Sequence, residues 1–96
     1  MTRLVWRPMA FADRDTIMDY IAQDNPAAAV ELDDDFEIKA EDARHRPTLY
    51  RTGRVQGTRE IVVRPNYIMV YRIEDEGGTV AVLRVLHAAQ QSPPAS

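Results

Sequence analysis

The sequence predicts an α+β fold in which a helical hairpin packs on a small, mostly antiparallel sheet, in the order β-α-α-β-β-β. Two adjacent segments, residues 10–23 and 26–44, repeat apolar residues at helical spacing. Three later segments, residues 59–63, 67–73 and 79–87, are rich in β-branched and aromatic residues and are separated by short turns. A chain of 96 residues is long enough for one core and too short for two, so residues 1–96 are expected to form a single domain.

The N-terminal part predicts a strand followed by a helix. Residues 4–7, LVWR, are typical of a short strand, which Pro8 ends. Within residues 10–23 one face is apolar and consists of Phe11, Ile17, Met18 and Ile21. The opposite face is charged, and most of it is expected to point to solvent: Asp13, Arg14, Asp15 and Asp19.

The second helix has a clear start and a clear buried stripe. Asn25 suits the N-cap and Pro26 suits the first helical position, where a missing N–H costs nothing. The expected buried stripe is Ala29, Leu32, Phe36, Ala40 and Ala43. The three adjacent acids at residues 33–35 point in different directions, so we expect a solvated face or an ion pair with an arginine of the sheet. His45 in the last turn complements the helix dipole, and Pro47 ends the helix.

The second half of the chain predicts a connector and three strands. Residues 48–57 contain Gly53 and Gly57 and are interpreted as a connector. The short turns after residues 63 and 73 favour antiparallel pairing of the three strands. Residues 79–87 are nearly continuously apolar, which predicts an interior position in the sheet. Residues 88–96 are small and polar with two prolines, and are expected to form an extended or mobile tail.

The charges are unevenly distributed. The net charge is −3, yet the segment from Arg51 to Arg72 holds five arginines and one acid. An acidic chain is not expected to bind free nucleic acid strongly, whereas a local cationic surface suits an acidic partner. The residues expected to contact a partner are Arg51, Arg54, Arg64, Arg72 and Tyr71.

Several functional classes are disfavoured by the composition. The chain has no cysteine, which excludes disulfides, thiolate zinc sites and catalytic thiols. It has no glycine-rich phosphate loop and no metal-ligand spacing, so no cofactor and no metal are expected. No apolar run approaches the roughly 20 residues needed to cross a bilayer, and the polar N-terminus does not resemble a secretion signal. We therefore expect a cytoplasmic protein.

Three residues are candidates for chemistry. Arg84 interrupts an apolar strand and needs either an acid, for which Glu60 is a candidate, or access to solvent. His87 ends the same strand and is either a polar strand-end residue or a site residue. Together with Arg59 they would form a plausible phosphodiester site. The guanidinium groups would bind the negative phosphate, and the imidazole would transfer a proton. However, Arg84 and His87 are three residues apart, so a bulge or a strand end between them is needed to bring them together.

Three segments resemble the RelE/ParE superfamily of type II toxins. They are NPAAA (25–29), RPTLYRTGRVQGTREIVVRPNYIMVYRI (46–73) and VLRVLHAAQQSP (82–93), and the resemblance covers nearly the whole chain. It implies a toxin that a co-expressed antitoxin neutralises. The resemblance also implies one of two cellular targets, DNA gyrase for ParE-like members or the ribosome for RelE-like members.

The two activities make different demands on the sequence. RelE-like members cleave mRNA on the ribosome with basic residues of the sheet, and the resemblance places Arg59, Arg84 and His87 at or near such positions. Strongly active cleaving members are typically rich in lysine and arginine, whereas this acidic chain has a single lysine, Lys39. The NPAAA and LYRTGRV segments look closer to ParE-like members. Inhibition of gyrase is therefore the favoured expectation, and ribosome-dependent mRNA cleavage is the alternative.

Overall fold

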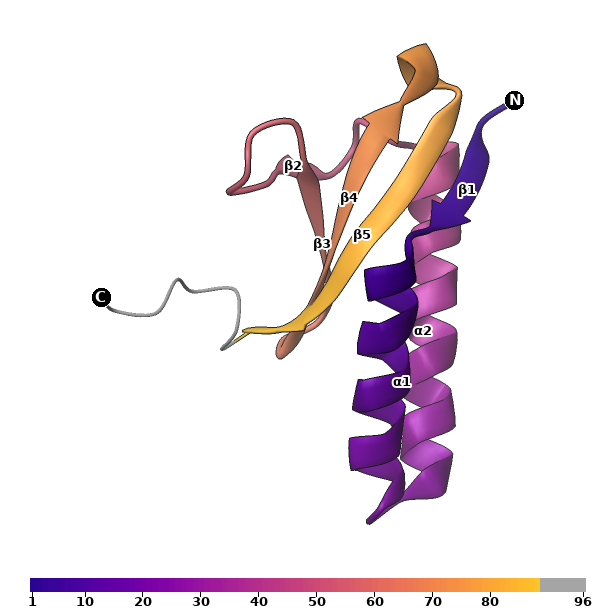
Figure 1. Ribbon diagram of the computed structural model, residues 1–96, viewed down its shortest axis with the longest axis vertical. Coiled ribbons are helices and arrows are strands. Elements are labelled where there is room, and N and C mark those ends of the chain that lie inside the picture. Colours follow the sequence, from indigo (N-terminus) through magenta and orange to yellow (C-terminus); the bar gives the residue numbers. More distant parts are fainter. Residues whose placement is uncertain (89–96) are drawn as a thin grey trace.

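Two long helices cover one face of a five-stranded sheet in the computed structural model, which describes residues 1–88 (Figure 1). The predicted tail therefore lies outside the described residues, apart from Ala88. The elements in chain order are β1 (Arg3–Trp6), α1 (Pro8–Ala22), α2 (Pro26–His45), β2 (Arg51–Thr52), β3 (Arg59–Arg64), β4 (Tyr67–Glu74), the 3-10 turn η1 (Asp75–Gly77) and β5 (Thr79–His87). The predicted fold class and order are confirmed, with one additional strand.

The strand order in the sheet is β1-β5-β4-β3-β2. The first strand runs parallel to β5, and the other neighbours pair antiparallel, as the short turns predict. The interior position of β5 is confirmed, since it lies between β1 and β4. The additional strand, β2, has only two residues and lies within the expected connector, where Arg51 pairs with Glu60. A strand this short has no periodicity of its own and forms only because β3 offers it a free edge.

The predicted start and buried stripe of α2 are confirmed. The Asn25 side chain accepts a hydrogen bond from the Ala28 N–H at 3.1 Å, and Pro26 occupies the first turn. Such a cap satisfies one of the N–H groups that a helix start leaves unpaired. The stripe is buried at all five predicted positions: Ala29, Leu32, Phe36, Ala40 and Ala43.

The predicted outward face of α1 is wrong for Arg14, which is 8% exposed. Its guanidinium carbon lies 4.4 Å from the centre of the Trp6 ring, and two of its nitrogens donate to the Asp33 carboxylate at 2.8 and 2.7 Å. This arrangement pairs the buried charge and stacks its flat surface on an aromatic ring. Phe11 shows the opposite error, since it is 52% exposed.

The three adjacent acids of α2 have separate environments. Asp33 binds Arg14 of α1, and Asp35 accepts two hydrogen bonds from Arg64 of β3 at 3.0 and 2.6 Å. Only Asp34 is exposed. The expectation of a solvated face therefore holds for Asp34 alone, and the two flanking carboxylates tie α2 to α1 and to the sheet.

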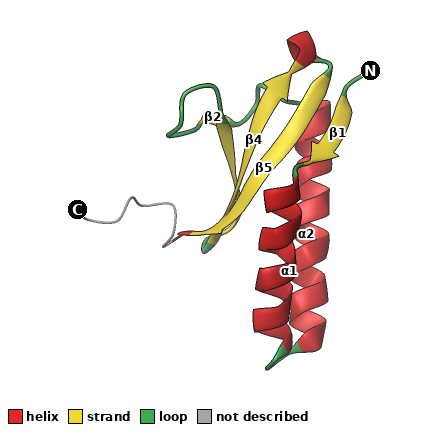
Figure 2. Ribbon diagram, viewed as in Figure 1, coloured by secondary structure: helices red, strands yellow, loops and turns green. Residues whose placement is uncertain are grey.

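The core lies between the helical hairpin and the inner face of the sheet (Figure 2). Phe36 of α2 meets Tyr67 of β4 edge to face, with ring centres 6.0 Å apart. Tyr71 is fully buried, and its hydroxyl donates to the Pro47 carbonyl at 2.5 Å. A buried phenol needs such a partner, and this one anchors the segment that follows α2. In residues 1–88, neither helix is long and apolar enough to cross a membrane.

Candidate functional site

A bulge in β5 determines which of its side chains face the helices. Val80, Val82 and Val85 all belong to the core, although the last two are three positions apart. The pairing with β4 explains this spacing, because its register shifts between Val70, opposite Arg84, and Tyr71, opposite Val82. The extra residue moves Val85 onto the helix-facing side, and His87, two positions later, shares that side. This bulge lies before Arg84, whereas the pairing with β4 is regular from Arg84 to His87, so the expected bulge between these two residues is not found.

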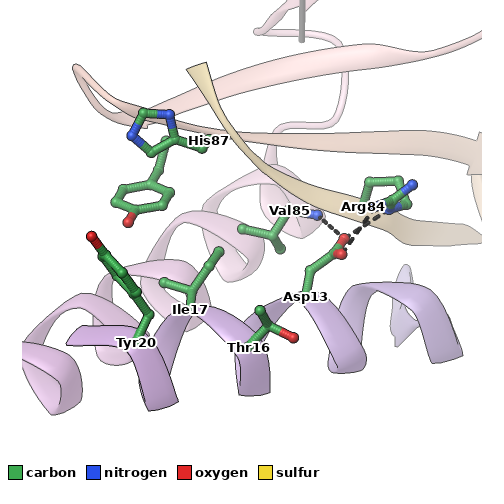
Figure 3. A pocket seen from close by; sticks show the side chains of 8 residues that line it. Asp13, Thr16, Ile17, Tyr20, Arg84, Val85 and His87 are labelled. Atoms are coloured by element: carbon green, nitrogen blue, oxygen red, sulfur yellow. Dashed lines mark hydrogen bonds and ion pairs between the residues drawn. The ribbon is translucent and has the colours of Figure 1, made fainter. Parts of the chain in front are cut away.

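Arg84 is held by an acid of α1 and not by Glu60, so that expectation is wrong. Its Nε and Nη2 atoms donate to the two carboxylate oxygens of Asp13 at 2.8 and 3.0 Å (Figure 3). One of these oxygens also accepts the Val85 N–H at 2.9 Å. The hydrogen bond and charge of Asp13 raise the pKa of Arg84. Asp13 thereby neutralises the guanidinium and fixes the backbone at the bulge.

Arg84 and His87 line one cleft, which lies between α1 and the C-terminal half of β5 and has a volume of about 360 Å³. Figure 3 shows the α1 side chains pointing toward the strand across this space. The cleft is lined by Asp13, Thr16, Ile17, Tyr20, Tyr67, Arg84, Val85 and His87. Its walls are therefore largely aromatic and apolar, with one ion pair at the side.

The His87 ring packs edge to face against Tyr67, with ring centres 5.3 Å apart. Burial, with a smaller contribution from the neighbouring Tyr20, raises the pKa of Tyr67, so this phenol stays protonated at neutral pH. Tyr20 is 72% exposed at the mouth of the cleft. The site is therefore suited to an apolar or aromatic group.

Arg59 lies elsewhere. It lines a second pocket, of about 400 Å³, together with residues of the loop between β2 and β3. Its Nη1 atom donates to the Tyr50 carbonyl at 2.7 Å and to the Thr48 carbonyl at 3.4 Å. The structure thus brings Arg84 and His87 together and leaves Arg59 outside their cleft.

Two arginines of the arginine-rich segment, Arg51 and Arg64, are paired with acids of the chain. Arg51 donates to the buried Glu60 carboxylate at 3.1 Å, and Arg64 is paired with Asp35. Arg54 is exposed, and its backbone N–H donates to Glu60. Arg72 is also exposed and has no acidic partner within residues 1–88. The alternation of arginines therefore produces two internal ion pairs, and Arg54 and Arg72 stay exposed.

The prediction that Tyr71 contacts a partner is wrong. It has 0% exposure and its hydroxyl is used by Pro47, so it supports the fold and does not present a contact surface. In contrast, Asp13, Tyr20 and Tyr67 line the cleft and were not singled out from the sequence. The unpaired charge of Arg84 in an apolar strand was a signal that an acid must lie near it, but it did not identify Asp13. In residues 1–88, no group of three or more His, Cys, Asp or Glu side chains could hold a metal ion.

The architecture is shared with solved toxins. A chain from the chromosomal ParDE toxin–antitoxin system of P. aeruginosa superposes with a TM-score of 0.77 over 91% of this chain and 96% of that chain, at 23% identity. The toxin–antitoxin complex RelBE2 of Mycobacterium tuberculosis contains a match with a TM-score of 0.58 at 29% identity, over 90% of this chain and 96% of that chain. The fold is therefore one found in solved toxin–antitoxin systems.

Sequence comparison identifies the family. Residues 4–92 match the model described as ParE toxin of type II toxin-antitoxin system, parDE. Toxin RelE2 of Caulobacter vibrioides is 34% identical over 94% of this chain and 99% of its own length. Putative toxin Y4kP of Sinorhizobium fredii is 35% identical over 95% of this chain and 93% of its own length. The chain belongs to the ParE toxin family of type II toxin–antitoxin systems.

Proposed function

We propose that this toxin acts in the cytoplasm by binding and inhibiting DNA gyrase, without a catalytic step of its own. The observation that carries the proposal is the separation of the candidate catalytic groups. The Arg84 guanidinium is occupied by both oxygens of Asp13, and Arg59 lines another pocket. A phosphodiester placed at His87 would find a cation already neutralised by an acid, whereas efficient transition-state stabilisation needs available donors at the reacting phosphate.

The overall charge supports the same proposal. A protein that docks on ribosomal RNA gains affinity by neutralising phosphates with lysine and arginine. This chain has a net charge of −3 and one lysine, and three arginines of its sheet, Arg51, Arg64 and Arg84, already pair with its own acids. Recognition of a protein surface through the aromatic cleft is more consistent with these features than recognition of polyanionic RNA.

The proposal is tested with purified gyrase and relaxed plasmid. Toxin at molar ratios near one should abolish supercoiling, because binding and not turnover limits the effect. A Tyr20→Ala variant, which removes the exposed ring at the mouth of the cleft, should need a higher concentration. Asp19→Ala, at an exposed neighbouring position of α1, is the matched control. Unchanged supercoiling at a large excess of toxin would reject the gyrase assignment.

A second candidate function is ribosome-dependent mRNA cleavage. The observation that favours it is that Arg84 and His87 do line one cleft. In this reaction the RNA 2′-hydroxyl attacks the adjacent phosphorus and the 5′-oxygen leaves; Arg84 would bind the phosphate, and His87 would transfer a proton. His87→Gln keeps a polar side chain of similar size and should then relieve growth inhibition strongly. Growth inhibition that persists in this variant would remove His87 from catalysis.

We also propose a cognate antitoxin as a partner, because the two solved systems described above are toxin–antitoxin systems. The exposed arginines Arg54 and Arg72 would contact an acidic extended segment of the antitoxin. Reversal of charge in Arg72→Glu should weaken antitoxin binding more than the same reversal in Lys39→Glu on α2. If Lys39→Glu has the larger effect, the antitoxin binds mainly over the helical hairpin.

A further inference from the structure

The pocket beside the β2–β3 loop contains a cation that no acid of residues 1–88 neutralises. Arg59 is half-buried, and its hydrogen bonds go to two backbone carbonyls, those of Thr48 and Tyr50. Three other arginines of the sheet, Arg51, Arg64 and Arg84, each have a carboxylate within 3.1 Å. A partly desolvated guanidinium without a counter-charge favours the binding of an anion.

The carbonyl bonds also fix the position of this cation. An arginine that is free in solvent loses side-chain entropy when it binds a ligand, whereas the Arg59 side chain is already held by its Nη1 atom. The remaining N–H groups of its guanidinium are not used by those two bonds. The site is therefore preorganised before any ligand arrives.

The rest of the lining supplies neutral hydrogen-bonding groups. Thr52, Gln56, Thr58 and the glycines 53 and 57 line the pocket with Arg59, and Ile73 forms an apolar side. The nearest acid in sequence, Glu60, points to the opposite face of the strand and is satisfied by Arg51 and the Arg54 N–H. No carboxylate of residues 1–88 lines the pocket.

We infer that this pocket binds a carboxylate presented by a partner polypeptide, on an acidic side chain or a chain terminus. One cation surrounded by neutral donors matches a monoanion, and a planar carboxylate fits the fork of a guanidinium. A phosphate dianion would find one cation, Arg59, among the described residues that line the pocket, and the net charge of −3 opposes the approach of a polyanion. The inference rests on this pocket alone and does not depend on which target the toxin inhibits.

The test is a titration of the purified full chain with sodium acetate at constant ionic strength, followed by backbone amide NMR shifts. Saturable shifts are expected at residues 52–59. Gln56 is exposed at the pocket, so Gln56→Glu and Gln56→Lys change the local charge without touching Arg59. Gln56→Glu should weaken acetate binding about threefold to tenfold at low salt, and Gln56→Lys should strengthen it.

The matched controls are Gln23→Glu and Gln23→Lys at the exposed end of α1, which should leave the acetate affinity unchanged. Three results would overturn the inference. They are the absence of saturable shifts at residues 52–59, an acetate affinity that Gln56→Glu does not change, and tighter binding of inorganic phosphate than of acetate. The Gln56 variants leave the hydrogen bonds of Arg59 to Thr48 and Tyr50 in place. A change in acetate affinity therefore reports the local charge and not a loss of folding.

Discussion

Asp13 of α1 and Arg84 of β5 are 71 positions apart in the sequence and form a two-point ion pair at 2.8 and 3.0 Å. The pair crosses the cleft between the hairpin and the sheet, and the same carboxylate holds the Val85 N–H at the β5 bulge. Asp13 thus fixes the geometry of the cleft, and it neutralises Arg84, the cation that phosphodiester cleavage at this site would need.

Asp13→Ala should therefore destabilise the fold. It leaves the Arg84 guanidinium and the Val85 N–H without their partner, a loss of about 2–3 kcal/mol in the free energy of unfolding. Asp13→Asn keeps an acceptor for the N–H and should cost less. Urea unfolding measures both, with Asp15→Ala, an exposed acid on the same helix, as the control. Equal stability of Asp13→Ala and Asp15→Ala would show that the pair does not hold the cleft together.

Arg14 supports the hairpin in a way that lysine cannot reproduce. Arg14→Lys keeps the charge but loses the two-point contact with Asp33 and the flat stack on Trp6, so we expect a loss of about 1–3 kcal/mol. The matched control is Arg3→Lys on β1, where the arginine is exposed. Thermal unfolding should separate the two variants. A melting temperature that falls equally in both would mean that stacking and fork geometry contribute nothing.

Gly53 is required by a close approach within the β2–β3 loop. Its N–H donates to the Thr58 carbonyl at 2.7 Å, and an added Cβ would lie 2.3 Å from the hydroxyl oxygen of the buried Thr58. Gly53→Ala must therefore move the loop or break the bond that Thr58 donates to Val55, at a cost of about 1–3 kcal/mol. Amide exchange in residues 52–59 should accelerate in this variant. Unchanged protection would show that the loop yields easily.

Tyr50 should ionise unusually late in a spectrophotometric titration of tyrosinate absorbance. Burial, followed by the hydrogen bond to Asp42, raises the pKa of Tyr50 from 10 to about 12. The folded state therefore holds this proton more tightly than the unfolded state, so the stabilisation is complete below pH 10 and is lost as the pH rises toward 12. Asp42→Asn should lower this pKa part of the way, since burial remains. If the pKa of Tyr50 does not change in Asp42→Asn, the hydrogen bond to Asp42 does not contribute to the raised pKa.

Much of the fold follows from local sequence signals. Asn25, Pro26 and the apolar stripe of α2 identify that helix because caps and periodicity are properties of adjacent residues. The bounds of β5 were predicted for the same reason, since a continuous apolar run is flanked by turn residues. The two-residue strand β2 carries no such signal, because it depends on an edge provided by β3.

The site was predictable only in part. Arg84 and His87 were identified by residue type and by their place at the end of an apolar strand, yet Arg84 lines the cleft while paired with Asp13 of α1, a contact that no local pattern encodes. The partner of Arg84 could be any of several acids, and only the packing of α1 on the sheet selects Asp13. The burial of Arg14 is likewise determined by Trp6 and Asp33, which approach it from two other elements.

Two parallel assays on one preparation of purified toxin distinguish gyrase inhibition from mRNA cleavage: gyrase supercoiling and the integrity of an mRNA undergoing translation. A gyrase-binding toxin should stop supercoiling near equimolar ratio and leave the mRNA intact. Cleaved mRNA together with normal supercoiling would contradict this account and would assign Arg84 and His87 to a ribonuclease site.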